Sequence, residues 1–262
     1  MRAQLKAVLF DMGNTLLEFE TLPWEELDRR ALDAAWQRLQ AEEGGAWPSR
    51  ERFHALYRQV LARFETEAAA THQERALGDF FEEVLGGCGV PPRSLLIRHL
   101  EEAHYGPIRS QVSLYPEVPG TLASLRARGL RLALVSNSFW PTELHLRDLA
   151  EFGIDDFFPI KVFSRDLGVR KPHARIFHEA LDGLGVRPGE AVFVGDRADR
   201  DVDGARAVGM RGVLRVHPRT YRAGAGPADA EIRALDELPG WLDRWYPDGP
   251  GPGTLTVGAN TA

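Results

Sequence analysis

Short runs of hydrophobic residues occur once near the start of this chain and then repeatedly over its second half, where they alternate with longer amphipathic stretches. The apolar runs cover residues 7–10, 130–135, 191–194 and 212–216, with a shorter run around 161–163. Continuous apolar runs of this length are typical of strands that are covered on both faces, as in a parallel sheet. Helical periodicity fills the intervals, at residues 119–128, 141–152, 173–183 and 199–208. This alternation predicts an α/β fold with a doubly wound, Rossmann-like parallel sheet.

The stretch that follows the first apolar run has a different pattern. Helical periodicity recurs over residues 24–42, 50–70, 74–85 and 92–105, without a convincing strand. Four successive helices predict a small bundle of their own. Because the bundle interrupts the α/β pattern after its first strand, we expect it to lie above the carboxyl end of that strand. The predicted division is an α/β core (residues 1–16 and 107–245), an all-α four-helix cap (17–106) and a Gly/Pro-rich tail (246–262).

Composition narrows the classes of function. The 262 residues carry a formal net charge of −6 and no basic block, which argues against a nucleic-acid partner. Cys88 is the only cysteine, so an intrachain disulfide is excluded and a reducing, cytoplasmic setting is expected. No apolar run approaches the roughly 20 residues that a membrane-spanning helix requires, and the first residues resemble a strand more than a signal peptide.

Polar side chains stand at the carboxyl ends of the predicted strands or in the loops near them. Ligands of open parallel sheets bind at this edge, because the strand ends meet there. An acid, a hydroxyl, an ammonium and an acid pair on separate elements therefore predict a small polar cavity. The residues concerned are Asp11, Ser136 with Asn137, Lys171, and Asp196 with Asp201.

The order and local context of these residues resemble the haloacid dehalogenase-like superfamily. The four stretches that carry the resemblance are Phe10-Asp11-Met12-Gly13-Asn14-Thr15, Val135-Ser136-Asn137, Gly168-Val169-Arg170-Lys171-Pro172, and Val194-Gly195-Asp196 through Asp201. Each stretch alone is weak, but four in the family's order are a strong signal. The helical insertion between the first and second motifs is similar to the cap of that family, and the resemblance covers nearly the whole chain except its tail.

The resemblance implies a hydrolase that acts on a small phosphorylated metabolite. Asp11 would be the nucleophile and would form an aspartyl-phosphate, because a carboxylate is already anionic at neutral pH. An anion that approaches a phosphate dianion meets repulsion, so a Mg²⁺ ion is implied as cofactor. Hard oxygen ligands suit this ion. The implied ligands are Asp11, Asp196, Asp201 and the backbone carbonyl of Gly13.

Lys171, Ser136 and Asn137 are the implied contacts of the phosphoryl group. Lys171 would hold the nucleophile and the transferring oxygens, and Ser136 would donate a hydrogen bond to one of those oxygens. Taken singly, each of these residues has a structural explanation as a turn former, a helix cap or a solvated charge. The occurrence of all these residues together, in this order, favours a catalytic role for them. Asp199 and Asp203, by contrast, are interpreted as helix-terminal or surface acids.

The sequence departs from the phosphatases of the family at Gly13. In those enzymes the acid two residues after the nucleophile protonates the leaving group, and general acid–base help is typically worth about 10²–10⁴-fold. A phosphosugar mutase is therefore disfavoured. A phosphonate hydrolase is disfavoured too, because it needs a cap lysine and the only lysines are Lys6, Lys161 and Lys171.

Two alternatives to a phosphatase stay open. One is a 2-haloacid dehalogenase, which also lacks the second acid and needs no metal. Against it, dehalogenases carry an aromatic residue where Gly13 stands, and two carboxylates facing Asp11 without a cation would repel it. The other is a degenerate, non-catalytic binding protein. We also expect the loop at residues 44–47, between the first two cap helices, to contact substrate.

Overall fold

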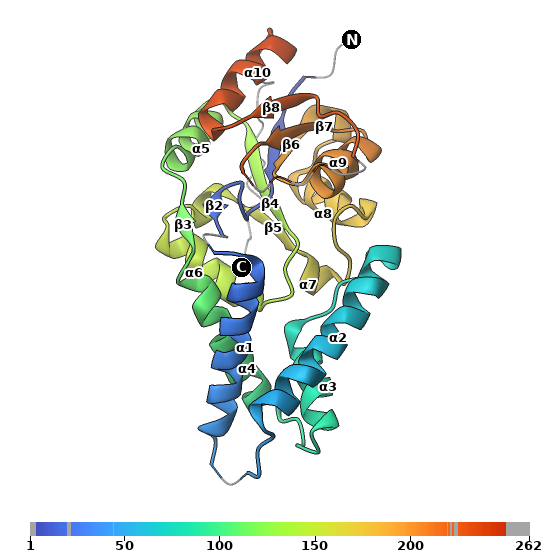
Figure 1. The fold of residues 1–262 in the computed structure, drawn as a ribbon. Helices are drawn as coiled ribbons and strands as arrows, with labels where there is room; N and C mark the ends of the chain where they lie inside the picture. Colours follow the sequence, from blue (N-terminus) through green and yellow to red (C-terminus); the bar gives the residue numbers. More distant parts are fainter. Residues whose placement is uncertain are drawn as a thin grey trace, which may run out of the picture.

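The computed structural model describes residues 4–19, 22–43, 45–218, 220, 222 and 225–249. It divides visibly into a sheet-containing half and a four-helix half (Figure 1). Gly44 and residues 250–262, the greater part of the expected tail, lie outside the described residues. Among the helices that are described, none is both long enough and apolar enough to cross a bilayer.

The centre of the first half is a six-stranded sheet in the order β5-β4-β1-β6-β7-β8. All five pairings are parallel, so the α/β prediction with a parallel sheet is confirmed. β1 lies centrally, with Phe10 beside Leu134 of β4 and Val194 of β6. The strands are β1 (Ala7–Phe10), β4 (Arg131–Ser136), β5 (Ile160–Phe163), β6 (Ala191–Gly195), β7 (Arg211–Arg215) and β8 (Ala230–Ile232).

Helices cover both faces of this sheet, and alternate strand residues serve the two faces. Val8 and Phe10 of β1 share a hydrophobic cluster with side chains of α5, α6 and α10. Ala7 and Leu9 share another with side chains of α8 and α9. Burial on both faces explains why the strands have no polar alternation. The helices are α5 (Val118–Ala127), α6 (Thr142–Glu151), α7 (Ser164–Leu167), α8 (Ala174–Leu184), α9 (Asp203–Ala207) and α10 (Leu238–Trp245).

The second half is a bundle of α1 (Trp24–Gln40), α2 (Arg50–Thr71), α3 (Leu77–Gly87) and α4 (Ser94–Arg109). In it α1 packs against α4, and α2 against α3. Figure 1 shows the bundle on the side of the sheet toward which β1 runs. An antiparallel pair, β2 (Leu17–Glu18) with β3 (Ser113–Leu114), stands where the chain leaves the core and returns to it.

Several details differ from the sequence-based expectation, which did not include the short elements β2, β3 and α7. The predicted helix over 199–208 begins instead as one wide π-helical turn, Ala198–Val202, and only then continues as α9. The edge strand β8 and helix α10 were not predicted, because three residues and eight residues give too short a periodic signal. Short 3₁₀ turns complete the elements, at Asp155–Phe157, Pro188–Glu190 and Leu235–Glu237.

A buried arginine at the end of β7 joins the core to the base of the bundle. Arg215 is only 3% exposed and pairs with Glu117 at 2.7 Å. Its guanidinium also donates to the carbonyl of Thr15 and lies 3.6 Å from the centre of the Tyr115 ring. Thr15 lies just before β2, and Tyr115 lies just after β3. Arg215 therefore contacts both segments that connect the sheet-containing half to the helical half.

We expect Glu117→Ala to lower the free energy of unfolding by about 3 kcal/mol, because the change leaves the Arg215 charge buried without its partner. Chemical denaturation measured by circular dichroism tests this. Glu102→Ala is the matched control, since Glu102 is exposed, and its effect should stay below about 0.5 kcal/mol. Equal effects of the two substitutions would contradict a stabilising role for the buried pair.

Candidate active site

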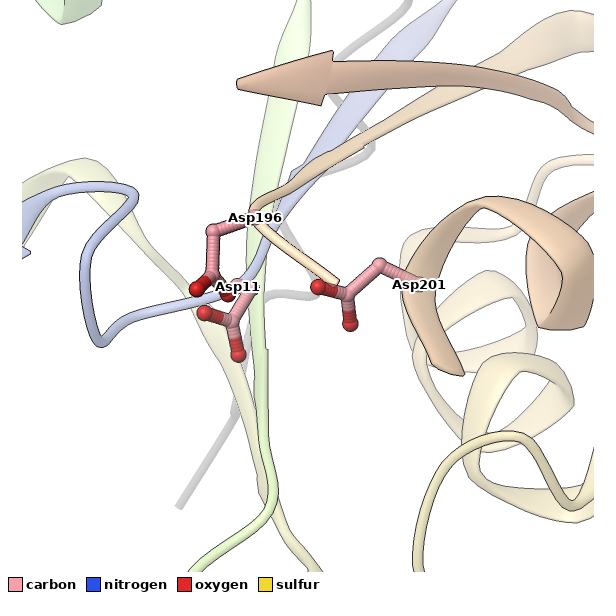
Figure 2. A group of neighbouring side chains, drawn as sticks. All are labelled: Asp11, Asp196 and Asp201. Atoms are coloured by element: carbon pink, nitrogen blue, oxygen red, sulfur yellow. The ribbon is translucent and has the colours of Figure 1, made fainter. Parts of the chain in front are cut away.

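Polar side chains lie close together at the carboxyl ends of three neighbouring strands. Asp11 follows β1, Ser136 closes β4 and Asp196 follows β6, and all three are buried. β1 lies between β4 and β6, so the parallel register places these positions side by side. Figure 2 shows the Asp11 and Asp196 carboxylates next to one another, with Asp201 facing them from the turn before α9.

The three carboxylates form one compact cluster. One oxygen each of Asp11, Asp196 and Asp201 can be chosen so that all three lie within 4.8 Å of one another. Like charges this close strongly disfavour full ionisation unless a cation lies among them. Oxygen-only ligands of this kind suit a hard divalent cation such as Mg²⁺. The donor set therefore fits the ion that the sequence implied.

Lys171 is the cation that the chain itself supplies. Its Nζ lies 2.5 Å from Asp11 Oδ1 and 2.8 Å from Asp201 Oδ1, and it donates to the carbonyl of Val135 at 2.9 Å. These three partners match the three hydrogens of an ammonium. The backbone of Lys171 is held in turn by Asn137, whose side chain accepts from its N–H at 2.8 Å and donates to its carbonyl at 3.1 Å.

Burial and charge pull the protonation states in opposite directions. Burial raises the pKa of Asp11 to about 7, the Lys171 ammonium opposes this, and the neighbouring carboxylates raise the pKa further. Burial also raises the pKa of Asp201 against the influence of Lys171. For Lys171 burial disfavours the charge, but Asp11 and Asp201 outweigh it and raise its pKa. One ammonium is thus too little for three carboxylates, which again favours a bound cation.

The loop after β1 keeps Asp11 in place while leaving room beside it. Asn14 has a positive φ of 55°, a conformation that asparagine tolerates, and Thr15 Oγ1 donates to Asp11 Oδ2 at 3.3 Å. Gly13 does not have a positive φ, and a Cβ there would meet only the Phe19 side chain, at 3.8 Å. A Cβ would therefore fit at residue 13, so neither backbone conformation nor crowding at that atom requires a glycine there.

A cavity of about 880 Å³ opens from this cluster toward the helical half. Ser136 and Asn137 line it together with Asp11, and their contact with a ligand stays a prediction. Its far wall comes from α1 and α2, through Trp24, Asp28, Tyr57, Leu61, Phe64 and Glu65. The expected contact from the loop at residues 44–47 is not found, because none of its described residues lines the cavity. Trp47 instead packs against the hydrophobic core and donates from its indole to the carbonyl of Glu42 at 3.0 Å.

Sequence reasoning missed several residues of the site. His217, just beyond β7, lies with Nε2 3.0 Å from Asp196 Oδ2. Arg170 and Arg200 line the cavity near Glu74 and Asp199. Arg170 stood inside a recognised motif, so attention to its position before Lys171 would have found it. His217 follows an ordinary strand without any motif, and only the sheet order brings it to Asp196.

Comparisons with known proteins agree on one family. The model of a family described as haloacid dehalogenase-like hydrolases matches residues 5–209. The chain is 34% identical to a glyceraldehyde 3-phosphate phosphatase of Methanopyrus kandleri, over 92% of this chain and 94% of the relative. It is 33% identical to a phosphoserine phosphatase of Thermus thermophilus, over 80% and 88%. The crystal structure of a 2-haloacid dehalogenase from Pseudomonas syringae is similar with a TM-score of 0.67, at 26% identity, over 92% of this chain and 99% of that one.

We expect Gly195→Ala to weaken Mg²⁺ binding about tenfold or more, since loss of one carboxylate ligand's placement costs on that order. A Cβ at residue 195 would lie 2.2 Å from Asp201 Oδ2 and would displace that carboxylate from the cluster. Titration calorimetry with Mg²⁺ measures the effect. Gly240→Ala is the control, because nothing lies within 4 Å of its Cβ. Unchanged Mg²⁺ affinity in the Gly195 variant would remove Asp201 from the metal site.

Proposed function

This chain belongs to the haloacid dehalogenase-like hydrolases, and we propose that it is a Mg²⁺-dependent phosphatase of a small phosphorylated metabolite. One observation carries the proposal: three buried carboxylates lie within 4.8 Å of one another and share a single lysine. A cluster of this charge disfavours an anionic substrate on its own and accepts one when a divalent cation is bound.

Asp11 is the proposed nucleophile. A carboxylate oxygen attacks phosphorus, the bond between phosphorus and the leaving-group oxygen breaks, and an aspartyl-phosphate forms. Water then attacks the same phosphorus, so inorganic phosphate leaves and the Asp11 carboxylate is regenerated. When bound by Asp11, Asp196, Asp201 and the Gly13 carbonyl, Mg²⁺ supplies the charge neutralisation that lets one anion approach another.

The remaining roles follow from contacts of this chain. Lys171 lies 2.5 Å from Asp11 Oδ1, so it keeps the nucleophile oriented and favours its ionised form. Ser136 lines the cavity beside Asp11 and is assigned as a hydrogen-bond donor to a phosphoryl oxygen. Asn137 holds the Lys171 backbone at both its N–H and its carbonyl. We assign residues 17–106 as the cap, which limits access of water to the reacting centre.

The relatives support a phosphate monoester without fixing which one. The two curated relatives reported above are named for glyceraldehyde 3-phosphate and for phosphoserine, which differ in charge and in functional groups. Both are small phosphorylated metabolites, and we propose the same class for this chain. The leaving oxygen obtains its proton from water or from a group other than residue 13, because Gly13 has no side chain.

A 2-haloacid dehalogenase is the second candidate, and the structural similarity to such an enzyme favours testing it. Its reaction would use Asp11 to displace halide from carbon without a metal. The close grouping of Asp196 and Asp201 around Asp11 opposes this reaction. When no cation is bound, the two carboxylates raise the pKa of Asp11 and so disfavour its ionised, nucleophilic form. The two reactions differ in product and in metal dependence, so one assay separates them.

We expect phosphate release from 4-nitrophenyl phosphate to require Mg²⁺ and to fall at least about 10³-fold in Asp11→Asn, which removes the nucleophile. Phosphate is measured with and without chelator. Asp156→Asn is the control, because Asp156 is exposed and precedes β5 at the opposite edge of the sheet. Chloride release from 2-chloropropionate in the presence of chelator would select the dehalogenase, and absence of both activities would select the binding protein.

We expect Gly13→Asp to raise kcat about tenfold or more on an alkyl phosphate such as glycerol 3-phosphate, because it restores a proton donor beside the leaving group. A Cβ at residue 13 would come no closer than 3.8 Å to the Phe19 side chain, so the substitution starts from an uncrowded position. On 4-nitrophenyl phosphate, whose leaving group needs no proton, kcat should stay within about twofold. A uniform loss on both substrates would show that residue 13 serves only as a metal-binding carbonyl.

A further inference from the structure

The segment between α2 and α3 is attached to the loop that carries Lys171. The backbone of residues 72–74 pairs with that of residues 168–170 through two hydrogen bonds, of 3.0 and 2.9 Å, and an antiparallel bridge. Lys171 is the next residue after this pairing. A part of the helical half is therefore fixed to the backbone immediately before the lysine of the site.

The carboxylate of Glu74 makes a second attachment at the same place. Its side chain is fully buried, and Oε2 accepts a hydrogen bond from the Ser164 hydroxyl at 2.7 Å. The same oxygen lies 3.6 Å from Nε of Arg170, the residue just before Lys171. Burial raises the pKa of Glu74, and the charge of Arg170 and the Ser164 hydroxyl oppose this rise. Both partners thus favour an ionised Glu74, which can only accept.

Ser164 extends this contact to the loop after β4. Its Oγ accepts from the backbone N–H of Ser138 at 2.8 Å, and its hydroxyl hydrogen points to Glu74, because the Ser138 carbonyl is farther away, at 3.3 Å. Ser138 directly follows Asn137, whose side chain holds the backbone of Lys171 at both its N–H and its carbonyl. A continuous series of contacts therefore joins Glu74 to Lys171.

We propose that Glu74 is a positioning residue, through which the helical half fixes the place of Lys171 in the site. Glu74 reaches Lys171 from two sides, through Arg170 and through Ser164 with the loop that contains Asn137. Lys171 in turn lies 2.5 Å from Asp11 Oδ1. The inference rests on the proposed function, and it adds a residue of the helical half to those on which the reaction of Asp11 depends.

A second buried carboxylate of the helical half offers a matched comparison. Glu101 of α4 is 3% exposed and lies 2.7 Å from Arg165. Among the interactions of the described residues, none joins Glu101 to Ser164 or to Arg170. Loss of either carboxylate breaks a buried contact between the two halves, but only loss of Glu74 breaks a contact that leads to Lys171. The pair therefore separates an effect on stability from an effect on the position of Lys171.

Steady-state kinetics of the full-length protein with Mg²⁺ on 4-nitrophenyl phosphate test the proposal. We expect Glu74→Ala to lower kcat about tenfold or more, because a displaced ammonium stabilises the transferring oxygens less well. Glu74→Gln keeps an oxygen that can accept from Ser164 and should recover part of this loss. Glu101→Ala should keep kcat within about twofold, since it acts at a site independent of Lys171.

Nitrogen-15 spectra of the lysine ammonium groups give a measurement that does not depend on turnover. The chain has only three lysines, and the Lys171 side chain is far less exposed than those of Lys6 and Lys161. Its buried, hydrogen-bonded ammonium exchanges hydrogen slowly, which identifies its signal. We expect this signal to shift or broaden in Glu74→Ala and to keep its position in Glu101→Ala.

Other outcomes overturn the inference. An unchanged kcat or an unchanged Lys171 signal in Glu74→Ala would leave Glu74 with a role in stability only. Equal losses in Glu101→Ala, or no recovery in Glu74→Gln, would do the same. If Glu74→Ala does not fold, Ser164→Ala breaks the same series of contacts and decides the question by the same two measurements. If the unmodified protein does not hydrolyse 4-nitrophenyl phosphate, the proposed function is refuted, whereas the lysine spectra still show whether Glu74 positions Lys171.

Discussion

Repulsion among three buried carboxylates is the constraint on which the rest of this structure depends. Asp11, Asp196 and Asp201 are each almost inaccessible to solvent, and Lys171 is the one side-chain ammonium in contact with them among the described residues. Burying such a cluster is unfavourable unless its charge is matched. Asn137 holds the backbone of Lys171, and His217 contacts Asp196. The three carboxylates that remain undercompensated could hold a metal ion.

The helical half forms the side of the cavity that faces the carboxylates, and this side includes several aromatic residues. Aromatic side chains, Trp24, Tyr57 and Phe64 among them, face the carboxylates across the cavity. The buried residues of the bundle belong to the same hydrophobic cluster as one face of the sheet, so the two halves are packed together and not merely linked. In the proposed function, a phosphate would bind at the polar side of the cavity, and its leaving group would face the largely apolar side.

Particular residues show how far sequence reasoning reached. The nucleophile candidate, the lysine and the acid pair stand next to strand ends and in ordered motifs, and parallel strands bring such ends together by necessity. His217 could not be found this way, because it follows β7 without a motif. Asp28 and Tyr57 could not be found either, since a polar residue on an amphipathic helix is usually solvated. Residues 45–47 were expected at the cavity and lie elsewhere, because the loop position says nothing about which end of the bundle faces the core.

The sequence alone therefore determined the parallel sheet, the helical insertion and the identity of the residues around Asp11. These depend on local periodicity and on strand ends, both of which are encoded over a few neighbouring positions. Only the tertiary structure decided which helices form the far wall of the cavity and that His217 lies beside Asp196. Such features arise from contacts between segments far apart in the chain, and no local pattern specifies how those segments are oriented.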